Sequence, residues 1–336
     1  MTVRLEACGK VFLAGEYAVL DAGRPALVVG IDRKLHAIAD PSPGLHILHS
    51  PTGVAWDSGR APPELRFAAR AAELARAFCA TSAGVRIVFE DDLGVPGRKL
   101  GLGGSAAACV LAVRAVCAVV GRKTADAEVL SLALAAHWAE QDGSGSGADV
   151  AAAALGGVLE VRSRIPWRSV EEVMAMPAAQ VASSRPLEIR RVRVPPDLRL
   201  LLADAGAPAN TRSLVRDARR FAEGDPQGWA KRAGEISAAA EQLRDALESG
   251  DAGSALAAVR SGAAAMASLG EDAQAPIVTP ELARACALAS AAGGAGKPSG
   301  AGGGDCAVIV AFGDQARDRV ESAMRAHFPV LRIAPA

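Results

Sequence analysis

The sequence predicts a chain of mixed helices and strands that folds as two domains. Its 336 residues are enough for one large domain or two of ordinary size, and two is the commoner arrangement at this length. Strand-like and helix-like segments occur in both halves. The composition changes within residues 163–184, which look irregular or weakly helical, so we place the boundary there, with domains at 1–175 and 176–336.

The first half opens with predicted strands. Residues 2–7 alternate polar and apolar side chains, and residues 8–20 continue as short strands around glycines. Residues 25–39 form two strand-like runs that are broken at Asp32 and Arg33, which predicts either a hairpin or a bulged strand. Further along, we expect a short strand within 45–48, a helix at 64–79 and a strand at 84–89.

A glycine-rich turn before a long helix is the most informative stretch. Gly101, Gly103 and Gly104 stand just before Ser105, and residues 105–120 are mostly strong helix formers. Such a loop can turn its N–H groups toward one point at the positive end of a helix dipole, which favours an anion. Ser105 is placed to cap the helix or to offer its hydroxyl to a phosphate-bound magnesium ion. The spacing matches neither a P-loop nor Gly-x-Gly-x-x-Gly, so an ordinary turn before a core helix is the alternative.

Two isolated charges flank this loop in the sequence. Lys10 is either a turn residue that reaches water or an ammonium placed on a phosphate. Asp149 lies among small residues after a second helix at 124–140, for which Thr124 is the expected cap. Asp149 is either the N-cap of the next helix or a carboxylate of the site. His137 and Glu140 lie nearby, although such residues near a helix end are usually solvated or satisfied locally.

The second half contains one more suggestive loop. Strands are expected at 158–161, 187–194, 198–203, 307–312 and 329–333, and helices at 213–223, 226–249, 252–269, 280–292 and 315–327. Asn210 or Thr211 would cap the first of these helices, with Arg212 in its first turn. The glycine-rich run at 291–306 lies between a helix and a strand, so we interpret it as a loop that brings Lys297, Ser299 and Asp305 to a site.

The composition excludes several classes of partner. Lys plus Arg and Asp plus Glu number 37 each, so no overall field favours nucleic acid or an anionic membrane. The six cysteines show no metal-binding spacing and are interpreted as buried apolar residues in a reducing compartment. Neither a leader segment nor a membrane span is recognised. These features predict a soluble cytoplasmic protein whose oligomeric state is open, a homodimer being compatible with them.

Three glycine-rich loops in this order, with Lys10 ahead of them, resemble the GHMP kinase superfamily. That family is named for galactokinase, homoserine kinase, mevalonate kinase and phosphomevalonate kinase. The first family motif is resembled by Gly9-Lys-Val-Phe-Leu-Ala-Gly-Glu-Tyr-Ala-Val19. The second motif, the ATP phosphate loop, is resembled by Gly101-Leu-Gly-Gly-Ser-Ala-Ala107, and the third motif is resembled by Ser299-Gly-Ala-Gly-Gly-Gly-Asp305. The phosphomevalonate kinase branch is the most similar, through the segments at 97–100, 143–151, 207–215 and 297–306.

The resemblance implies an α+β fold of two domains with the active site in the cleft between them. The N-terminal domain would be similar to ribosomal protein S5 domain 2, and the C-terminal domain would be ferredoxin-like. The implied reaction transfers the γ-phosphoryl group of MgATP to (R)-5-phosphomevalonate, giving 5-diphosphomevalonate and ADP. Mevalonate kinase or another small-molecule kinase of the superfamily is the alternative, and a non-catalytic nucleotide-binding regulator is a more distant one.

The resemblance also implies roles for individual residues. Lys10 and Asp149 would be catalytic, and Ser105 would bind Mg²⁺. ATP would be bound by Gly101, Leu102, Gly103, Gly104, Ser105 and Ala106. The acceptor would be bound by Lys99, Ser146, Gly147, Arg212, Lys297, Ser299, Gly300 and Ala301.

Two departures from the family pattern limit this transfer of roles. The usual pair of serines at the phosphate loop is Gly104-Ser105 here, so one hydroxyl is absent. Mevalonate kinases also bind magnesium through a glutamate on the helix before the Asp149 motif. Glu140 is near that position in a different register, and its role is left unassigned.

Overall fold

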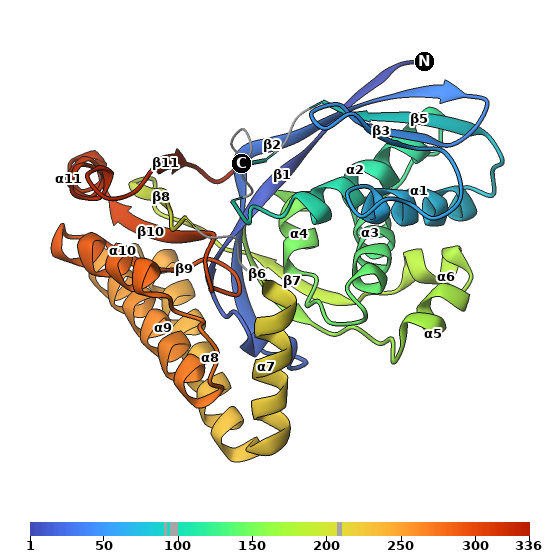
Figure 1. Cartoon of the computed structure of the whole chain (residues 1–336). Coiled ribbons are helices and arrows are strands. Elements are labelled where there is room, and N and C mark those ends of the chain that lie inside the picture. Colours follow the sequence, from blue (N-terminus) through green and yellow to red (C-terminus); the bar gives the residue numbers. More distant parts are fainter. Residues whose placement is uncertain (91–92, 95–99, 207–209) are drawn as a thin grey trace.

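The computed structural model describes the whole chain except residues 91–92, 95–99 and 207–209. Its first sheet has the strand order β4-β3-β5-β2-β6-β7, with β1 paired to β2 (Figure 1). These strands are β1 (Val3–Ala14), β2 (Pro25–Ser42), β3 (His46–His49), β4 (Val54–Trp56), β5 (Gly84–Phe89), β6 (Gly157–Ser163) and β7 (Leu187–Arg191).

The long strand β2 organises this sheet. Along one edge it pairs with β1, and along the other it pairs first with β6 and then with β5. Cys8 faces Lys34 while Gly9 faces Ile31, so Asp32 and Arg33 form a bulge. Of the two predicted alternatives, the bulged strand is therefore the one found. The several short strands expected at 8–20 are instead the end of β1 and a 3₁₀ turn, η1 (Ala18–Leu20).

Helices α2 (Gly104–Val119) and α4 (Ala148–Leu155) pack against the first sheet. Helices α1 (Arg66–Phe78) and α3 (Asp126–Glu140) pack in turn against α2 and against each other. Helix α2 is rich in Ala, Val and Cys and is buried on most sides, because small side chains let it lie close to its neighbours. The expected cap Thr124 is not used. Ala125 occupies the N-cap, and its N–H donates to the Glu128 carboxylate.

Residues 163–184 are more ordered than expected, because they contain the short helices α5 (Val170–Ala175) and α6 (Ala178–Ser183). Strand β7, which follows them, pairs with β6. The first sheet therefore continues to Arg191, beyond the boundary placed at residue 175.

The second sheet is antiparallel, with the order β11-β8-β10-β9. Its strands are β8 (Leu198–Asp204), β9 (Ala295–Pro298), β10 (Cys306–Phe312) and β11 (Val330–Ile333). Its helices are α7 (Thr211–Gly224), α8 (Pro226–Ser249), α9 (Ala252–Asp272), α10 (Pro280–Ala291) and α11 (Asp314–Arg325). The strand and helix order is that of a ferredoxin-like unit in which several helices replace the first one. Asn210 caps α7 as predicted, whereas the glycine run contains β9, which was not predicted.

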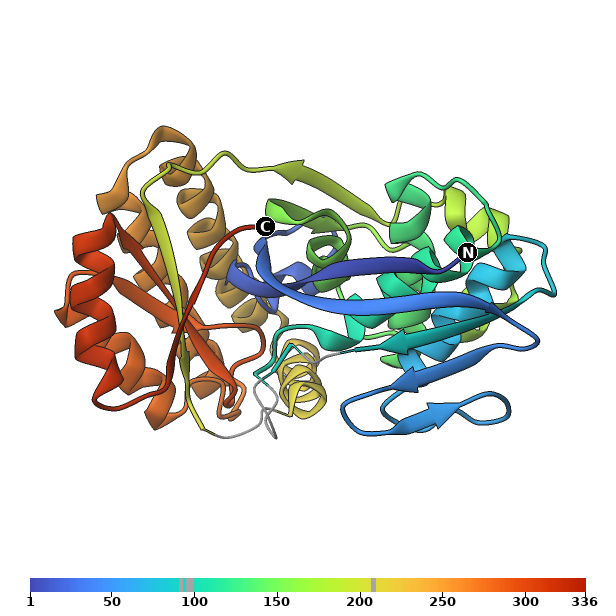
Figure 2. The ribbon, with the colours of Figure 1, turned by 90° about the horizontal axis from the view of Figure 1, so that it is seen from above.

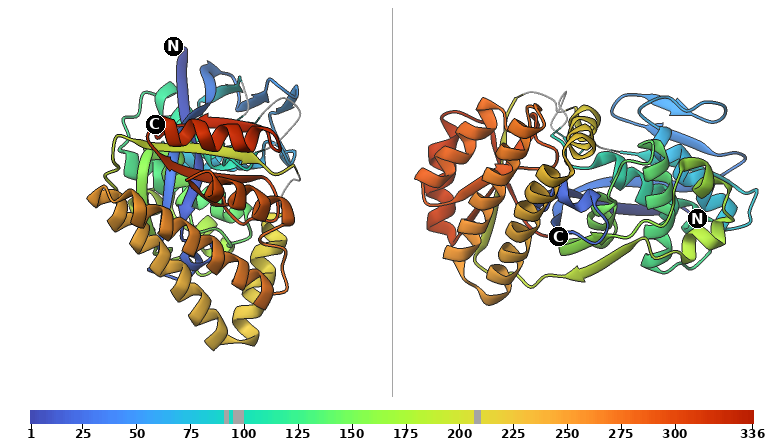
Figure 3. Two further views of the ribbon diagram at one scale, coloured as in Figure 1. Left: turned by 90° about the vertical axis from the view of Figure 1, so that its left-hand side faces the viewer. Right: turned by 90° about the horizontal axis from the view of Figure 1, so that it is seen from below.

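The two faces of the second sheet bury different helices. Leu201 and Ile309 pack with residues of α10 and α11, whereas their neighbours Leu202 and Val308 pack in the core that includes α8 and α9. Figure 3 shows α8 and α9 as a long hairpin on one side of this sheet. The same core continues into the first domain, so the two domains share an apolar interface.

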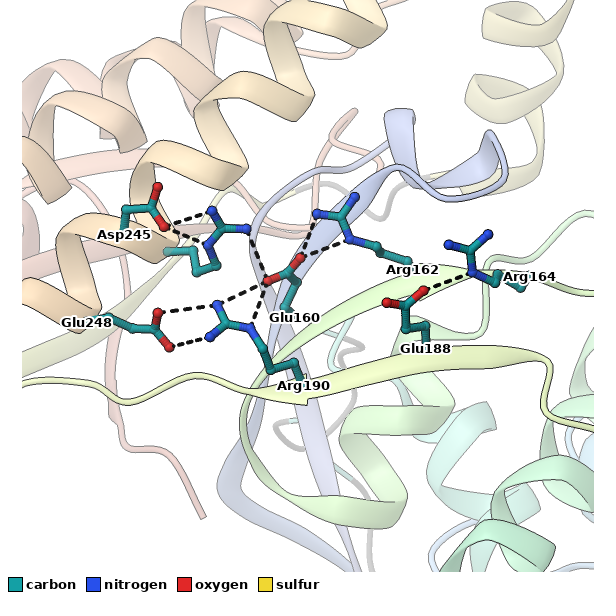
Figure 4. Close-up of a pocket in the computed structure, with 8 residues that line it drawn as sticks. Glu160, Arg162, Arg164, Glu188, Arg190, Asp245 and Glu248 are labelled. Atoms are coloured by element: carbon teal, nitrogen blue, oxygen red, sulfur yellow. Dashed lines mark hydrogen bonds and ion pairs between the residues drawn. The ribbon is translucent and has the colours of Figure 1, made fainter.

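A polar cluster adds to this interface (Figure 4). The carboxylate of Glu160 on β6 accepts hydrogen bonds from Arg162 on β6, Arg190 on β7 and Arg244 on α8. Arg190 also donates to Glu248 on α8 at 2.8 Å. We call these five residues the Glu160 cluster. Because Glu160 is buried while its partners come from both domains, the cluster fixes α8 against the first sheet.

Candidate active site

A cleft of about 890 Å³ lies between the two domains. Seen from above, α7 stands at the junction of the two halves (Figure 2), and its N-terminal residues line the cleft. The glycine loop before α2, the end of β1 and the start of α4 form the opposite wall. The cleft thus brings together Lys10, Gly101, Leu102, Gly103, Gly104, Ser105, Ser146, Asp149, Arg212, Gly300 and Ala301, all of which were expected to belong to a site.

The phosphate loop has a conformation that requires glycine. Gly101 has φ +68° and Gly103, the N-cap of α2, has φ +82°. A Cβ at Gly101 would lie 2.5 Å from Asp305 Oδ2, and one at Gly103 would lie 2.7 Å from Lys10 Cγ. The loop therefore packs directly against Lys10 of the first motif and Asp305 of the third, and its residues also line the cleft.

Lys10 is held by this loop. Its backbone N–H donates to Leu102 O at 2.8 Å, and its ammonium Nζ donates to Gly101 O at 2.7 Å. Burial lowers the pKa of Lys10 below its ordinary value, although the carboxylates of Asp149, Asp305 and Glu16 oppose this shift. The ammonium thus lies in a water-poor place with acidic side chains around it, where a positive charge acts strongly on a nearby anion.

The N-cap of α4 is Gly147, so Asp149 is not the cap. It lies in the first turn, where its Oδ2 is 3.7 Å from Nε2 of His137. The same nitrogen is 3.0 Å from Ser105 Oγ. Burial is the main cause that lowers the pKa of His137, so the imidazole is neutral near pH 7. Ser105, His137 and Asp149 therefore form one connected group at the cleft wall.

The third glycine-rich loop is attached to the first motif. Ser299 Oγ accepts the N–H of Phe12 at 3.2 Å, and the Tyr17 hydroxyl donates to Ala301 O at 2.5 Å. Lys297 on β9 does not reach the cleft as expected. Its side chain is buried, forms an ion pair with Glu16 and donates to Pro298 O. The positive charge of Lys297 thus neutralises Glu16 and holds the two domains together.

Arg212, which lines the cleft, contacts Glu140 at the end of α3. Arg212 donates to Glu140 O at 2.8 Å, and its guanidinium lies 3.7 Å from Asp142. The Glu140 carboxylate forms an ion pair with Arg70 and lies 3.6 Å from Arg66. It does not line the cleft and is already neutralised by two arginines, which disfavours the role of a magnesium ligand.

The remaining expected site residues are placed as follows. Ala106 is buried in the first turn of α2, and Gly147 starts α4 with φ +81° beneath Leu134. Lys99 lies outside the described residues, so its role stays a prediction.

The structure adds three residues to which sequence reasoning gave no role: Glu16, Tyr17 and His137. Glu16 is buried and lines the cleft, and its Oε2 has no hydrogen-bond partner among the described residues. A carboxylate inside an apolar run was a visible signal for Glu16. His137 carried no comparable signal, because its two partners come from segments 32 positions before it and 12 after it.

Comparisons with known proteins agree with this geometry. Residues 66–157 match the model of the GHMP kinases N terminal domain, and residues 243–330 match that of GHMP kinases C terminal. A phosphomevalonate kinase from Streptomyces sp. (strain CL190) is 34% identical, over 94% of this chain and 92% of that protein. The chain belongs to the GHMP kinase family.

Solved structures of other GHMP kinases have the same fold. Phosphomevalonate kinase from Streptococcus pneumoniae, solved with phosphomevalonate and AMPPNP, superposes with a TM-score of 0.87 at 22% identity, covering 99% of this chain and all of the other. Mevalonate kinase from L. major, solved with R-mevalonate, has a TM-score of 0.73 at 21% identity, covering 99% of this chain and 95% of the other. In this GHMP kinase, no described helix is long and apolar enough to cross a membrane.

Proposed function

We propose that the protein transfers the γ-phosphoryl group of ATP to the phosphate of (R)-5-phosphomevalonate. The observation that carries this proposal is the meeting of Lys10, Asp149 and the glycine loop of α2 in one interdomain cleft. The similarity to the Streptomyces phosphomevalonate kinase over nearly the whole chain supports the choice of acceptor. Phosphoryl transfer needs mainly positioning and charge neutralisation, which are what these groups offer.

On the ATP side, the N–H groups of residues 101–105 would bind the phosphates at the positive end of α2. The Lys10 ammonium, now held by Gly101 O, would move to the transferred group and stabilise its negative charge. Because Lys10 is buried, water would screen this interaction little.

On the acceptor side, the nucleophile is already an anion. A phosphate monoester has a second pKa of about 6, so it is largely a dianion at neutral pH and hardly needs a base. Asp149 would then orient Lys10 and the acceptor, and it would be the general base only for an alcohol acceptor. Arg212 and Ser146 line the cleft and would bind the acceptor, with Ser299 fixing the adjacent loop and Lys99 expected to add a further positive charge.

The donors in the cleft fit a magnesium ion that comes with the nucleotide. Ser105 Oγ and the Asp149 carboxylate are oxygen donors, and no group of three or more His, Cys, Asp or Glu among the described residues could hold a metal. Such a sparse set fits Mg²⁺, which keeps waters and phosphate oxygens as most of its ligands. We assign Ser105 as its protein ligand. When bound, the ion would neutralise charge on the phosphates.

ADP release with MgATP and a panel of mevalonate, 5-phosphomevalonate, homoserine and galactose tests this function. Turnover confined to 5-phosphomevalonate is expected. Preference for mevalonate would keep the fold and the ATP site but would assign Asp149 as the general base. Nucleotide binding without turnover on any acceptor would indicate a regulator. A cytoplasmic location and a homodimer remain predictions.

A further inference from the structure

His137 connects the phosphate loop to the candidate catalytic carboxylate through a single nitrogen atom. Its Nε2 is 3.0 Å from Ser105 Oγ on α2 and 3.7 Å from Asp149 Oδ2 on α4, while His137 itself belongs to α3. We infer that His137 is a positioning residue, which orients the Ser105 hydroxyl toward the metal-bound nucleotide and holds it in register with Asp149. This inference rests on the function proposed above.

The imidazole has little freedom to move. The His137 side chain is 1% exposed, and its ring lies against that of Phe67 on α1, with centroids 5.0 Å apart. Neighbouring residues of α3, including Ala136, are also buried. A ring enclosed in this way keeps one orientation, so the position of Nε2 is set by the packing of α1 and α3.

Contact with this fixed nitrogen removes the rotational freedom of the Ser105 hydroxyl. At 3.0 Å the Nε2 and Ser105 Oγ atoms form a hydrogen bond, whereas the 3.7 Å from Nε2 to Asp149 Oδ2 is too long for one. If Nε2 accepts the hydroxyl proton, both lone pairs of Oγ remain for ligands in the cleft. If Nε2 carries the proton, it donates to one lone pair of Oγ, and the other lone pair and the hydroxyl proton remain for the cleft. In both tautomers at least one lone pair of Ser105 Oγ stays available to the cleft in a direction set by Nε2, which a freely rotating hydroxyl would not provide.

A purely structural role is the competing explanation. A buried histidine on a helix commonly finds a serine as its partner without any part in catalysis. Here, however, both neighbours of Nε2 line the cleft, and they belong to the two helices whose N-termini face it. A structural role predicts a loss of stability alone, whereas a positioning role predicts a change in metal-dependent nucleotide binding.

The test replaces His137 by Leu and by Gln. The Leu variant removes Nε2, and the Gln amide nitrogen can reach the place of Nε2. Affinity for a fluorescent ATP analogue is measured with Mg²⁺ and with EDTA, and kcat and KM are measured for the accepted substrate. For His137→Leu we expect affinity with Mg²⁺ and kcat each to fall about tenfold or more, with affinity in EDTA unchanged. His137→Gln should recover most of both losses.

Ser131→Ala is the matched control. Ser131 is also buried on α3, and its hydroxyl donates to Ser184 O at 2.8 Å, away from the cleft. This variant should lower the melting temperature without changing metal-dependent binding. If His137→Leu behaves as Ser131→Ala does, with lower stability and unchanged magnesium dependence, His137 is structural and the inference is wrong.

Two further measurements keep the test decisive. If His137→Leu does not fold, His137→Asn, whose shorter amide does not reach the place of Nε2, is combined with Ser105→Ala. A histidine that acts through the serine should then add little to the loss caused by Ser105→Ala, whereas fully additive losses would contradict the inference. The nucleotide-binding assay uses no acceptor. Failure of 5-phosphomevalonate as a substrate would therefore overturn the proposed function without deciding the role of His137.

Discussion

At the scale of single residues, Lys10 shows how burial and charge compete in the cleft. Its side chain lies against Gly103 of the phosphate loop, and its ammonium is bonded to Gly101 O. Burial makes the ammonium costly in the free protein, but the same burial makes it effective on a bound phosphate. The charge of Lys10 is therefore expected to favour activity and to lower the stability of the free protein.

Lys10→Met should abolish most of the turnover while the protein remains folded. Methionine has a similar length and no charge to bury, so the melting temperature should stay the same or rise. We expect kcat to fall about 100- to 1,000-fold, because a group that stabilises the transferred charge is lost. Steady-state kinetics, nucleotide binding and thermal unfolding are the measurements. Turnover close to that of the wild type would exclude this lysine from the mechanism.

The lowered pKa of Lys10 predicts a pH dependence of activity. The ammonium is active only when protonated, so kcat/KM should be full at neutral pH and should fall as the pH rises through the pKa of the free enzyme. Because burial lowers this pKa, the decline should begin below the ordinary lysine value of about 10.4. A decline centred at or above the ordinary value would contradict the prediction. Phosphate groups ionise near pH 6 and do not interfere.

Residues with a strong local pattern were the ones predicted from the sequence. Ser105 and Asp149 follow glycine-rich turns, which mark helix starts, and both lie in the cleft. Lys297 was predicted to reach the cleft because its charge is visible in the sequence, whereas its buried partner Glu16 lies 281 positions away. Glu16 stands out locally as a carboxylate inside an apolar run, but its partner, like those of His137, comes from a distant segment that no local pattern identifies.

At the scale of elements, the glycines of the phosphate loop differ in what they require. Gly103 has a positive φ and no room for a Cβ beside Lys10, whereas a Cβ on Gly104 would meet nothing within 4 Å. The sequence predicted the loop and α2 because their signals are local. It did not predict β9, because a strand of four residues within a glycine run exists only through its pairing with β10.

Gly103→Ala should be destabilising and Gly104→Ala should not. A left-handed conformation costs alanine about 1–2 kcal/mol, and displacement of Lys10 adds to this cost. Gly104 lies within α2, where alanine should leave the free energy of unfolding unchanged or raise it by up to about 1 kcal/mol. Urea unfolding of the two variants measures both effects. Equal stabilities would show that the loop relaxes without strain.

At the scale of the whole molecule, the domains are joined by a shared apolar core and by the Glu160 cluster. Burial alone would raise the pKa of Glu160, but hydrogen bonds and charges from Arg162 and Arg244 outweigh it and lower the pKa. The cluster thus contributes stability that is fully present above the ordinary carboxyl pKa of about 4.3 and is lost as the pH falls through the lowered value.

Glu160→Gln should weaken the junction between the domains. Removing the carboxylate leaves three arginines close together, and because these are partly exposed we expect a loss of about 1–3 kcal/mol of unfolding free energy at pH 7. The difference from the wild type should shrink at acidic pH. Glu188→Gln is the control, because Glu188 and Arg164 form an ion pair in which both side chains are 58% exposed. A similar loss in both variants would mean that burial of the cluster is unimportant.

The Glu16–Lys297 pair has a consequence for how this protein can change over evolutionary time. The two side chains are almost fully buried and come from different domains. Replacing one partner alone leaves the other charge buried without a counter-charge, which typically costs about 3–5 kcal/mol of unfolding free energy. Replacing both partners by apolar residues of similar volume can be neutral. A lineage that crosses from the charged pair to an apolar pair must pass through a poorly stable intermediate or change both codons together. Among relatives, positions 16 and 297 should therefore covary, although they lie near opposite ends of the sequence.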